Sequence, residues 1–375
     1  MSTNTNHEAL RAQAIKAFSE VLLKWYKVEG RHHLPWQKHD NWYTRLVSEV
    51  MLQQTQVVTV IPYFERFMSC FPTPEALAQA DDEFVMAQWA GLGYYSRARN
   101  LLKTVRYIVH TRAGVIPESA EAWAQCPGIG PSTAGAIAAF TTGERAVMCD
   151  GNAKRVIARV FAIEGYPGER TFDQATWEMA QALLPRSDDM ADYTQALMDL
   201  GATVCKRQPE CQRCPLLSLC EGHKQGKATL IPMKKPKKVR PTFYTTMLFV
   251  FQRDRLWLKK QMERTVWQDL WIPQMLARET EPLSVSASMY WPSEAIRSEQ
   301  ALSEWVHNFS HFQLIIRPLW VELTPEASLP DAWGDFEAYP IGDSEALPAM
   351  PAPVKSLFER IVALRNSPHT LVLEP

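Results

Sequence analysis

The sequence has no long hydrophobic run. No stretch approaches the roughly 20 apolar residues that a membrane-spanning helix needs. Residues 1–10 are polar and contain no apolar signal core. No segment recurs at a fixed period, which argues against a solenoid. We therefore expect a soluble protein that stays inside the cell.

The sequence also has no strong bias in composition or excess of one charge. Hydrophobic residues make up 46% and charged residues 22%, which is ordinary for a globular protein and excludes disordered or collagen-like chains. The net charge is −1, so the total does not indicate nucleic-acid binding. Its 375 residues are more than one ordinary core accommodates and favour two domains.

The charge is unevenly distributed along the chain. Residues 1–225 carry 23 basic and 24 acidic residues, and residues 242–375 carry 11 basic and 17 acidic residues. Between them, residues 226–241 contain six basic residues and no acidic one. A run of this kind is most often a solvated linker, so we predict a basic connector between two domains.

The two blocks differ in hydrophobic pattern. In residues 8–225 apolar residues recur at helical spacing, and four stretches show it most clearly: 46–58, 101–109, 156–161 and 196–204. After the connector, the aromatic and β-branched run 243–251, a polar break and a short apolar run predict a hairpin. Residues 309–321 favour strands, and residues 353–361 favour a helix. The pattern predicts an all-α domain followed by an α+β domain.

Four of the seven cysteines crowd together. Their spacing is Cys205-x5-Cys211-x2-Cys214-x5-Cys220, which allows four thiolates of one loop to surround a metal centre. Zinc sites usually pair two close Cys-x2-Cys units, and only one exists here. The wide-narrow-wide spacing suits an iron–sulfur cluster at least as well. Both zinc and a cluster remain open on spacing alone.

The segment 126–137 is the most specific motif. A helix-like stretch before it ends at Pro127-Gly128, and Ser132 and Thr133 are good residues to begin the next helix. Gly128 and Gly130 let the backbone approach a ligand, and amides at a helix start suit a DNA phosphate. We interpret this as a helix–hairpin–helix. A plain helix–turn–helix corner is the alternative.

An aspartate follows this motif. Asp150 precedes a helix that we expect to begin near Asn152. The simplest interpretation is an ordinary helix N-cap. The helix dipole and amide donors would keep its carboxylate ionised, which also suits stabilising a positive charge.

These motifs together resemble a superfamily of base-excision DNA glycosylases, and the four cysteines resemble its iron–sulfur branch. Residues 48–57 and 91–100 are similar to motifs of the adenine DNA glycosylase (MutY) family, and Phe309-Ser310-His311 resembles that family's lesion-recognition loop. The likeness spans about residues 15–365. One departure is the first cysteine gap, which has five residues here and usually six in the family.

The resemblance implies an architecture. Residues 1–225 would form a two-lobed, all-α helix–hairpin–helix glycosylase domain with an iron–sulfur loop at 205–220. Residues 226–241 would be the linker, and residues 242–375 an α+β MutT-like (Nudix-fold) domain. That second domain has no recognisable Nudix box, so we expect it to bind the lesion rather than to hydrolyse nucleotides.

The resemblance also implies a function. The chain would be a monofunctional adenine DNA glycosylase of base excision repair, removing adenine mispaired with 8-oxoguanine or guanine and leaving an abasic site. One 4Fe–4S cluster would be its cofactor, and double-stranded DNA with these mispairs its partner. We expect a monomer without membrane contact, cytoplasmic and nucleoid-associated as in bacteria.

The resemblance also implies roles for individual residues of this sequence. Glu49, at the edge of an apolar stripe, would protonate the base once burial raises its pKa, and Asp150 would stabilise the sugar cation, with a brief covalent adduct implied. Ser132 replaces the lysine with which bifunctional relatives attack the sugar. The resemblance places further DNA contacts at Gln54 and Tyr94 in the gap left by the base, Arg31, Leu34, Trp36 and Gln195 in the adenine pocket, and Asn152 near the attacking water. The phase of Gln54 indicates that the preceding helix ends before it.

Three other functions deserve comparison. A bifunctional pyrimidine glycosylase disagrees with Ser132 and with the second domain. A non-catalytic iron–sulfur DNA-binding protein disagrees with the presence of both carboxyls. A nucleotide hydrolase disagrees with the missing acidic box. Four basic residues offer contacts to DNA phosphate: Arg97, Arg99, Lys154 and Arg155.

Overall fold

The computed structural model describes residues 2–38, 41–185, 189–236, 240–262, 266–309, 311–342 and 347–366. The chain divides into two compact units. The first comprises Met1–Ala80 and Tyr94–Lys237, and the second comprises Asp81–Gly93 and Lys238–Pro375. Within the described ranges, no helix has the length and apolar character needed to cross a membrane.

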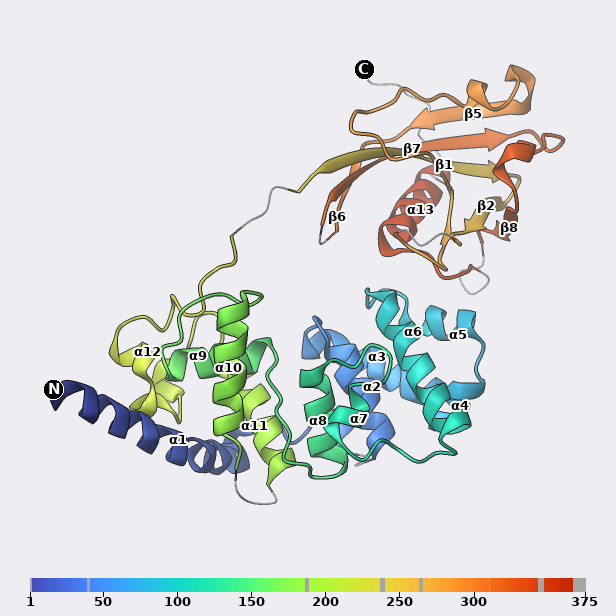
Figure 1. Ribbon diagram of the computed structural model, residues 1–375. Coiled ribbons are helices and arrows are strands. Elements are labelled where there is room, and N and C mark those ends of the chain that lie inside the picture. Colours follow the sequence, from blue (N-terminus) through green and yellow to red (C-terminus); the bar gives the residue numbers. More distant parts are fainter. Residues whose placement is uncertain are drawn as a thin grey trace. The chain divides into compact units, whose positions relative to one another are not determined.

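The first unit is helical (Figure 1). Its α-helices are α1 (Ser2–Glu29), α2 (Trp42–Leu52), α3 (Val57–Cys70), α4 (Pro74–Gln79), α6 (Tyr95–Arg106), α7 (Ala120–Trp123), α8 (Pro131–Thr141), α9 (Gly151–Val160), α10 (Arg170–Ala182), α11 (Met190–Thr203) and α12 (Glu221–Lys224). A π-helical turn, Tyr107–Thr111, continues α6. Short 3-10 turns lie at Pro35–Gln37, Cys211–Arg213 and Leu217–Leu219.

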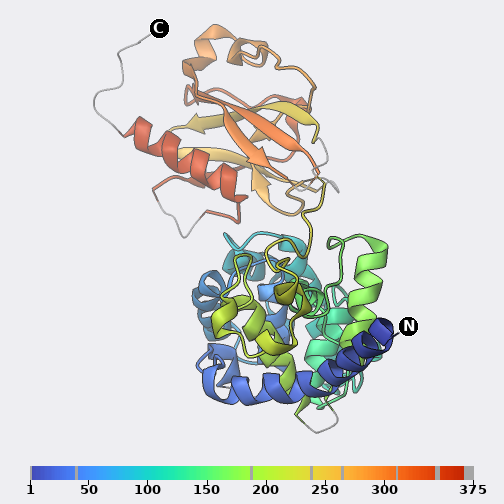
Figure 2. The same ribbon diagram turned by 90° about the vertical axis from the view of Figure 1, so that its left-hand side faces the viewer.

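These helices pack in two groups. In one, α2 packs against α3, α6 and α8; in the other, α9 packs against α10, α11 and α12. The long α1 runs along the outside of the unit and packs on α11 (Figure 2). Leu22, Val156 and Leu197 are among the fully buried residues of the second group. Because α8 packs against both α2 and α11, it joins the two groups.

The helical pattern is largely confirmed, with two corrections. Val57 and Val58 do not continue the stripe of α2, because that helix ends at Leu52 and α3 begins at Val57; Val58 is 73% exposed. The second helix of the hairpin motif begins at Pro131 with Gly130 as its N-cap, rather than being capped by Ser132 or Thr133. Proline is favoured at the first helical position because its missing N–H would have no partner there.

The second unit contains helix α5 (Asp82–Trp89) and a mixed sheet. Its strands are β1 (Thr242–Gln252), β2 (Arg255–Lys260), β3 (Trp271–Ile272), β4 (Gln274–Met275), β5 (Ile296–Ala301), β6 (Trp305–Asn308), β7 (Gln313–Leu323) and β8 (Glu337–Pro340). The central order is β3-β2-β1-β7-β5, with β4 on β1, β6 on β7 and β8 on β2. β1 and β7 run parallel, and β1 and β2 form the predicted hairpin.

Both faces of this sheet are covered. Met247, Phe249 and Phe251 of β1 pack with helix α13 (Ala352–Arg365), which is confirmed near its predicted position (Figure 1). The intervening Leu248 and Val250 belong to a separate cluster on the other face. Residues that alternate along a strand point to opposite faces, so a continuous apolar run such as β1 marks a strand buried on both sides.

Candidate functional site

Glu49 and Asp150 lie within electrostatic reach of each other. The pKa of Glu49 is raised to about 7, chiefly by burial and then by the negative charge of Asp150, while Arg45 lowers it. Glu49 lies on α2, next to the fully buried Ser48 and beside the buried Val50. The arrangement brings together the two carboxyls that the sequence singled out, and it favours a proton on Glu49 while Asp150 is charged.

Asp150 is the N-cap of α9. Its side chain accepts a hydrogen bond from the Ala153 amide at 2.8 Å. Burial raises the pKa of Asp150, and the amides of Ala153 and Asn152 lower it. The N-cap interpretation is therefore confirmed. We also expected the amide donors to have the largest effect on the pKa of Asp150. That expectation is wrong, because burial has the larger effect.

The hairpin holds the segment before Asp150 in place. The Ser132 hydroxyl accepts a hydrogen bond from the Cys149 amide at 2.9 Å, so this side chain adjoins the Asp150 turn. Gly128 has a positive φ of 75°, and a Cβ there would lie 2.6 Å from Nδ2 of Asn100. A side chain at Gly128 would therefore push the hairpin away from α6.

Gln54 and Tyr94 share an unusual backbone conformation. Both are non-glycine residues in the left-handed region, with φ of 58° and 49°. Gln54 is exposed and lies after the end of α2, as predicted, and Tyr94 is 55% exposed. A buried, hydrogen-bonded glutamine is therefore excluded. Strained, exposed residues of this kind cluster at functional sites.

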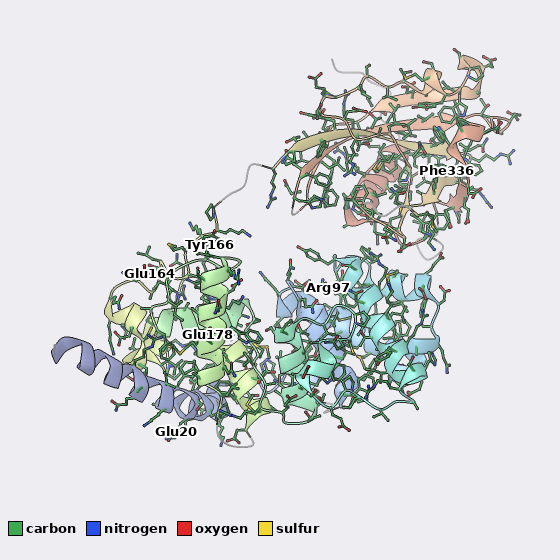
Figure 3. All side chains as sticks on the ribbon, in the orientation of Figure 1. Glu20, Arg97, Glu164, Tyr166, Glu178 and Phe336 are labelled. Atoms are coloured by element: carbon green, nitrogen blue, oxygen red, sulfur yellow. The ribbon has the colours of Figure 1, made fainter. Side chains whose placement is uncertain are left out.

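Arg97 contacts both the backbone next to Gln54 and the ring of Tyr94. Arg97, which Figure 3 labels in the first unit, is 7% exposed. Its guanidinium donates to the carbonyls of Met51 at 2.7 Å and of Gln53, and to Thr55 Oγ1 at 3.2 Å. The same group lies 5.3 Å from the ring centroid of Tyr94. The expectation that Arg97 contacts DNA phosphate is wrong, because its charge is buried against backbone carbonyls.

Asp199 joins two of the predicted pocket residues. Its carboxylate accepts from the amide N, Nε and Nη2 of Arg31 and from Nε2 of Gln195, all within 2.9 Å. Asp199 is completely buried, and Gln195 is 5% exposed. Leu34 and Trp36 are each 2% exposed, and Trp36 packs edge-on against Phe64. Asp199 was not among the residues that the sequence singled out.

The start of α9 is tied to α11 and to the cysteine loop. Nη2 of Arg155 donates at 2.8 Å to Oδ1 of Asn152 and to the Gly201 carbonyl, and its Nε donates to the Cys205 carbonyl. Lys154 forms an ion pair with Asp173 at 2.7 Å. Arg155 is half-buried and hydrogen-bonded within the protein, and its contact with phosphate stays a prediction.

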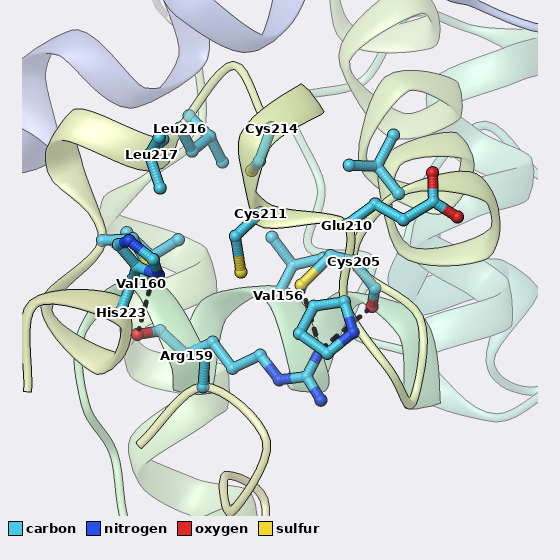
Figure 4. A pocket seen from close by; sticks show the side chains of 14 residues that line it. Val156, Arg159, Val160, Cys205, Glu210, Cys211, Cys214, Leu216, Leu217 and His223 are labelled. Carbon is cyan, nitrogen blue, oxygen red and sulfur yellow. Dashed lines mark hydrogen bonds between the residues drawn. The ribbon is translucent and has the colours of Figure 1, made fainter. Parts of the chain in front are cut away.

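The four clustered cysteines line one cavity (Figure 4). Cys205 and Cys220 are buried, and Cys211 and Cys214 are half-buried. Arg159, only 3% exposed, reaches into the loop and donates to Cys205 Sγ at 3.4 Å and to the carbonyls of Lys206 and Arg207. Arg159 was also missed, because its partners lie more than 40 residues away in sequence.

The donors of this cavity fit a thiolate-bound metal centre. The pKa of Cys214 is raised to about 12, chiefly by burial and with smaller contributions from the other three cysteines, while the Leu216 amide lowers it. A bound cation would reverse this effect, because it favours the thiolate form. In the described ranges, no three His, Cys, Asp or Glu side chains already form a single-ion site.

The predicted recognition loop is a turn of the second unit, between β6 and β7. The Phe309 amide donates to the Phe312 carbonyl at 2.9 Å, and the two rings stack at 4.6 Å. Phe309 also packs on Trp267, with ring centroids 5.6 Å apart, whereas His311 is exposed. Ser310 lies outside the described residues. Phe309 and Phe312 lie outside the strands, so the strand begins later than predicted, at Gln313.

Comparisons with known proteins show the family of this chain. Residues 47–182 match the HhH-GPD superfamily of base excision DNA repair proteins. The chain is 33% identical over 312 residues to the adenine DNA glycosylase of Buchnera aphidicola subsp. Schizaphis graminum (strain Sg), covering 83% of this chain and 89% of that relative. It is 42% identical over 234 residues to the Homo sapiens adenine DNA glycosylase, covering 60% of this chain and 42% of the human protein. A solved thermostable thymine-DNA glycosylase superposes with a TM-score of 0.50 at 25% identity, covering 57% of this chain and 98% of that one.

Proposed function

Since this chain belongs to the adenine DNA glycosylase family, we propose that it is a monofunctional enzyme excising adenine paired with 8-oxoguanine or guanine. Removal of adenine by hydrolysis of its N-glycosidic bond in base excision repair is the activity of the family. The observation that carries the proposal is the carboxyl pair, in which burial and the neighbouring Asp150 raise the pKa of Glu49 to about 7.

The first step is extrusion of adenine from the duplex, because an enzyme cannot reach the target atom of a base that is stacked within it. Gln54 and Tyr94 are exposed in the left-handed conformation, and Arg97 bonds the backbone before Gln54 and lies against the Tyr94 ring. This supports their role in filling the gap. Gly128 and Gly130 place backbone amides at the start of α8, where a DNA phosphate is favourably bound.

The second step is cleavage of the base–sugar bond. Glu49 donates its proton to the adenine ring as the bond breaks, and adenine leaves with the bonding electron pair. The ionised Asp150 stabilises the cationic sugar. One water then adds its oxygen to the sugar carbon and loses a proton, leaving free adenine and an abasic site. Asn152, in the first turn of α9, would orient that water.

Ser132 determines which products form. Its hydroxyl is hydrogen-bonded to the Cys149 amide and cannot form a Schiff base with the sugar. The strand is therefore left intact at the abasic site. This excludes the lyase step that a lysine at Ser132 would add.

The cysteine cavity is proposed to hold one 4Fe–4S cluster through Cys205, Cys211, Cys214 and Cys220. When bound, the cluster would neutralise the buried thiolates and brace the loop. Arg155 and Arg159 connect this loop to α9, the helix that begins after Asp150. The five-residue first gap leaves all four thiols on one cavity, so it does not argue against the cluster.

Recognition of the oxidised guanine is proposed for the second unit. Phe309 anchors the turn in an aromatic cluster, and the exposed His311 with Ser310 would hydrogen-bond the lesion edge. We assign residues 1–225 as the glycosylase domain, 226–241 as the linker and 242–375 as a MutT-like recognition domain. A monomer in the cytoplasm remains a prediction.

One assay tests the proposal. The protein is incubated with a duplex carrying adenine opposite 8-oxoguanine, and strand breaks are compared with and without alkali. We expect breaks after alkali alone, and far fewer when cytosine replaces adenine. Ser132→Lys should add alkali-independent breaks and a borohydride-trapped adduct. Breaks by the wild type without alkali would refute the monofunctional mechanism, and no breaks in either arm would refute the function.

A further inference from the structure

The basic connector begins packed on the first unit. Ile231 is 3% exposed and packs with Phe172 of α10. The Met233 amide donates a hydrogen bond to the Gly165 carbonyl at 2.8 Å. Residues 228–233 therefore form a segment, here called the linker anchor, that the helices of this unit hold before the chain continues to β1.

Arg159 bonds both the linker anchor and the cysteine loop. Its Nε donates to the Ile231 carbonyl at 2.7 Å, and its Nη1 donates to Cys205 Sγ at 3.4 Å. Nη1 and Nη2 also donate to the carbonyls of Lys206 and Arg207. Figure 4 shows the guanidinium beside Cys205. Because a guanidinium carries five N–H donors in one rigid plane, it links the two segments in a defined geometry.

The linker anchor also borders the cysteine cavity directly. Ala228 is 8% exposed and lines that cavity together with the four cysteines and Arg159. The Arg159 carbonyl accepts from Cys220 Sγ at 3.4 Å, and a Cβ at Gly222 would lie 2.5 Å from the same carbonyl. The cysteine loop and the linker anchor thus share one contact residue on α9, Arg159.

The partners of the Arg159 charge depend on whether a metal is bound. Arg159 is 3% exposed, and a buried cation is costly unless it is paired. A metal-bound Cys205 is a thiolate, which makes its hydrogen bond to the guanidinium charge-assisted. Without metal, a cysteine at neutral pH is ordinarily a thiol, a weak and uncharged acceptor, and the loop loses its cross-link. We expect Arg159 then to turn to solvent, which ends its bond to Ile231.

We propose that Arg159 is a positioning residue that couples the cysteine site to the linker anchor, so that the metal-loaded loop holds residues 228–233 on the first unit and loss of the metal releases them. This inference rests on the proposed cluster and adds a structural consequence of its presence. Release would lengthen the free tether between the two units. Since coupling between two sites is reciprocal, freeing the linker anchor must also weaken the binding of the metal.

Hydrogen exchange in the full-length protein tests the release. The amides of Ile231 and Met233 donate to the carbonyls of Lys227 and Gly165, so we expect both amides to be protected when the metal is bound. After iron is removed with a chelator, their exchange should become at least about tenfold faster. A peptide from α8 reports on global unfolding, because its amides are bonded within the helix, and its exchange should not change.

Substitutions test the coupling from both ends. Ile231→Ala removes the buried side chain of the linker anchor without altering the cysteine loop, and should hasten the loss of iron to a chelator about tenfold. Arg159→Gln should free the linker anchor while iron is bound, and adding Ile231→Ala to it should not hasten iron loss further. Arg159→Lys keeps the charge but lacks the planar fork, and should behave like Arg159→Gln. Arg170→Gln removes an exposed cation at the start of α10 and should change neither measurement.

The outcomes are distinguishable. Equal exchange of the linker anchor in the loaded and metal-free proteins would overturn the inference, while the cluster itself stands. A wild-type rate of iron loss in Ile231→Ala would also overturn it, and this variant suffices if Arg159→Gln does not fold. Exchange that rose equally in the α8 peptide would overturn it too, since the metal would then stabilise the whole unit. If the purified wild type held no metal, the proposed cluster would fail, and the inference with it.

Discussion

The carboxyl pair of the first unit and the recognition turn of the second unit are built in different ways. Glu49 has a pKa of about 7 because protein surrounds its carboxyl, and Asp150 is fixed by capping α9. At the turn, by contrast, Phe309 is half-buried against Trp267 and His311 is exposed. The proposed chemistry therefore depends on what surrounds a group, whereas the proposed recognition depends on groups presented to solvent.

This difference makes the two regions separable by mutation. A substitution that changes a buried carboxyl should alter rate with little effect on affinity. A substitution at the turn should alter lesion preference and leave the bond-breaking step intact. The predictions below test that separation, beginning with the largest expected effect.

Glu49→Gln should lower excision by about 10²- to 10⁴-fold, because it removes the proton donor. DNA binding should change little, which single-turnover rates and equilibrium binding measure separately. In the wild type, the rate should fall as pH rises above about 7, since Glu49 then loses its proton. A variant that kept the wild-type rate would show that the proton comes from elsewhere.

Cys211→Ser should remove most bound iron, measured by metal analysis and by absorbance near ~400 nm. DNA affinity should fall roughly tenfold with it, because the loop carries the exposed cations Lys206 and Arg207. Cys70→Ser, outside the cavity, is the matched control. Stoichiometric zinc without iron in anaerobically purified wild type would contradict the cluster.

Replacing both Ser310 and His311 by alanine should weaken discrimination between 8-oxoguanine and guanine opposite adenine. The loss of two hydrogen bonds corresponds to about 1–3 kcal/mol. Competition binding measures the preference, and the excision rate at saturating protein should stay near the wild-type value. Full lesion preference in the double variant would show that the turn does not read the lesion.

The smallest effect concerns stability. The pKa of Glu49 is raised from 4.5 to about 7 on folding, so protonated Glu49 favours the folded state. Its contribution is fully present below pH 4.5 and is lost as pH rises through 7, by at most about 3 kcal/mol. Urea unfolding at pH 5 and pH 8 should therefore show a larger decrease for the wild type than for Glu49→Gln. Equal decreases in the free energy of unfolding for the two proteins would indicate that the Glu49 carboxyl is in contact with water in the folded state.

Features with local chemistry were predictable from the sequence. Asp150 caps α9, the helix before Gln54 ends where its phase indicates, and the β1–β2 hairpin follows its polar break. Each depends on residues only a few positions apart. The errors have local causes as well: Val57 and Val58 keep the apolar spacing of α2 across a break, and Pro131 starts α8 earlier than Ser132.

The supporting residues were not predictable in the same way. Asp199 bonds Arg31 across 168 positions, Arg97 bonds Gln53 across 44, and Arg159 bonds Cys205 across 46. No periodicity or motif marks such partners. A buried charge is costly unless paired, yet a lone Arg or Asp in a helix looks like a surface residue until the chain is folded.

The position of Arg97 has a consequence for how variation would affect the protein. One guanidinium donates to the Gln53 carbonyl before Gln54 and to the Thr55 hydroxyl after it, and lies against the Tyr94 ring. The conformations of the two exposed residues are therefore coupled. A single substitution at the buried Arg97 would disturb both of them at once.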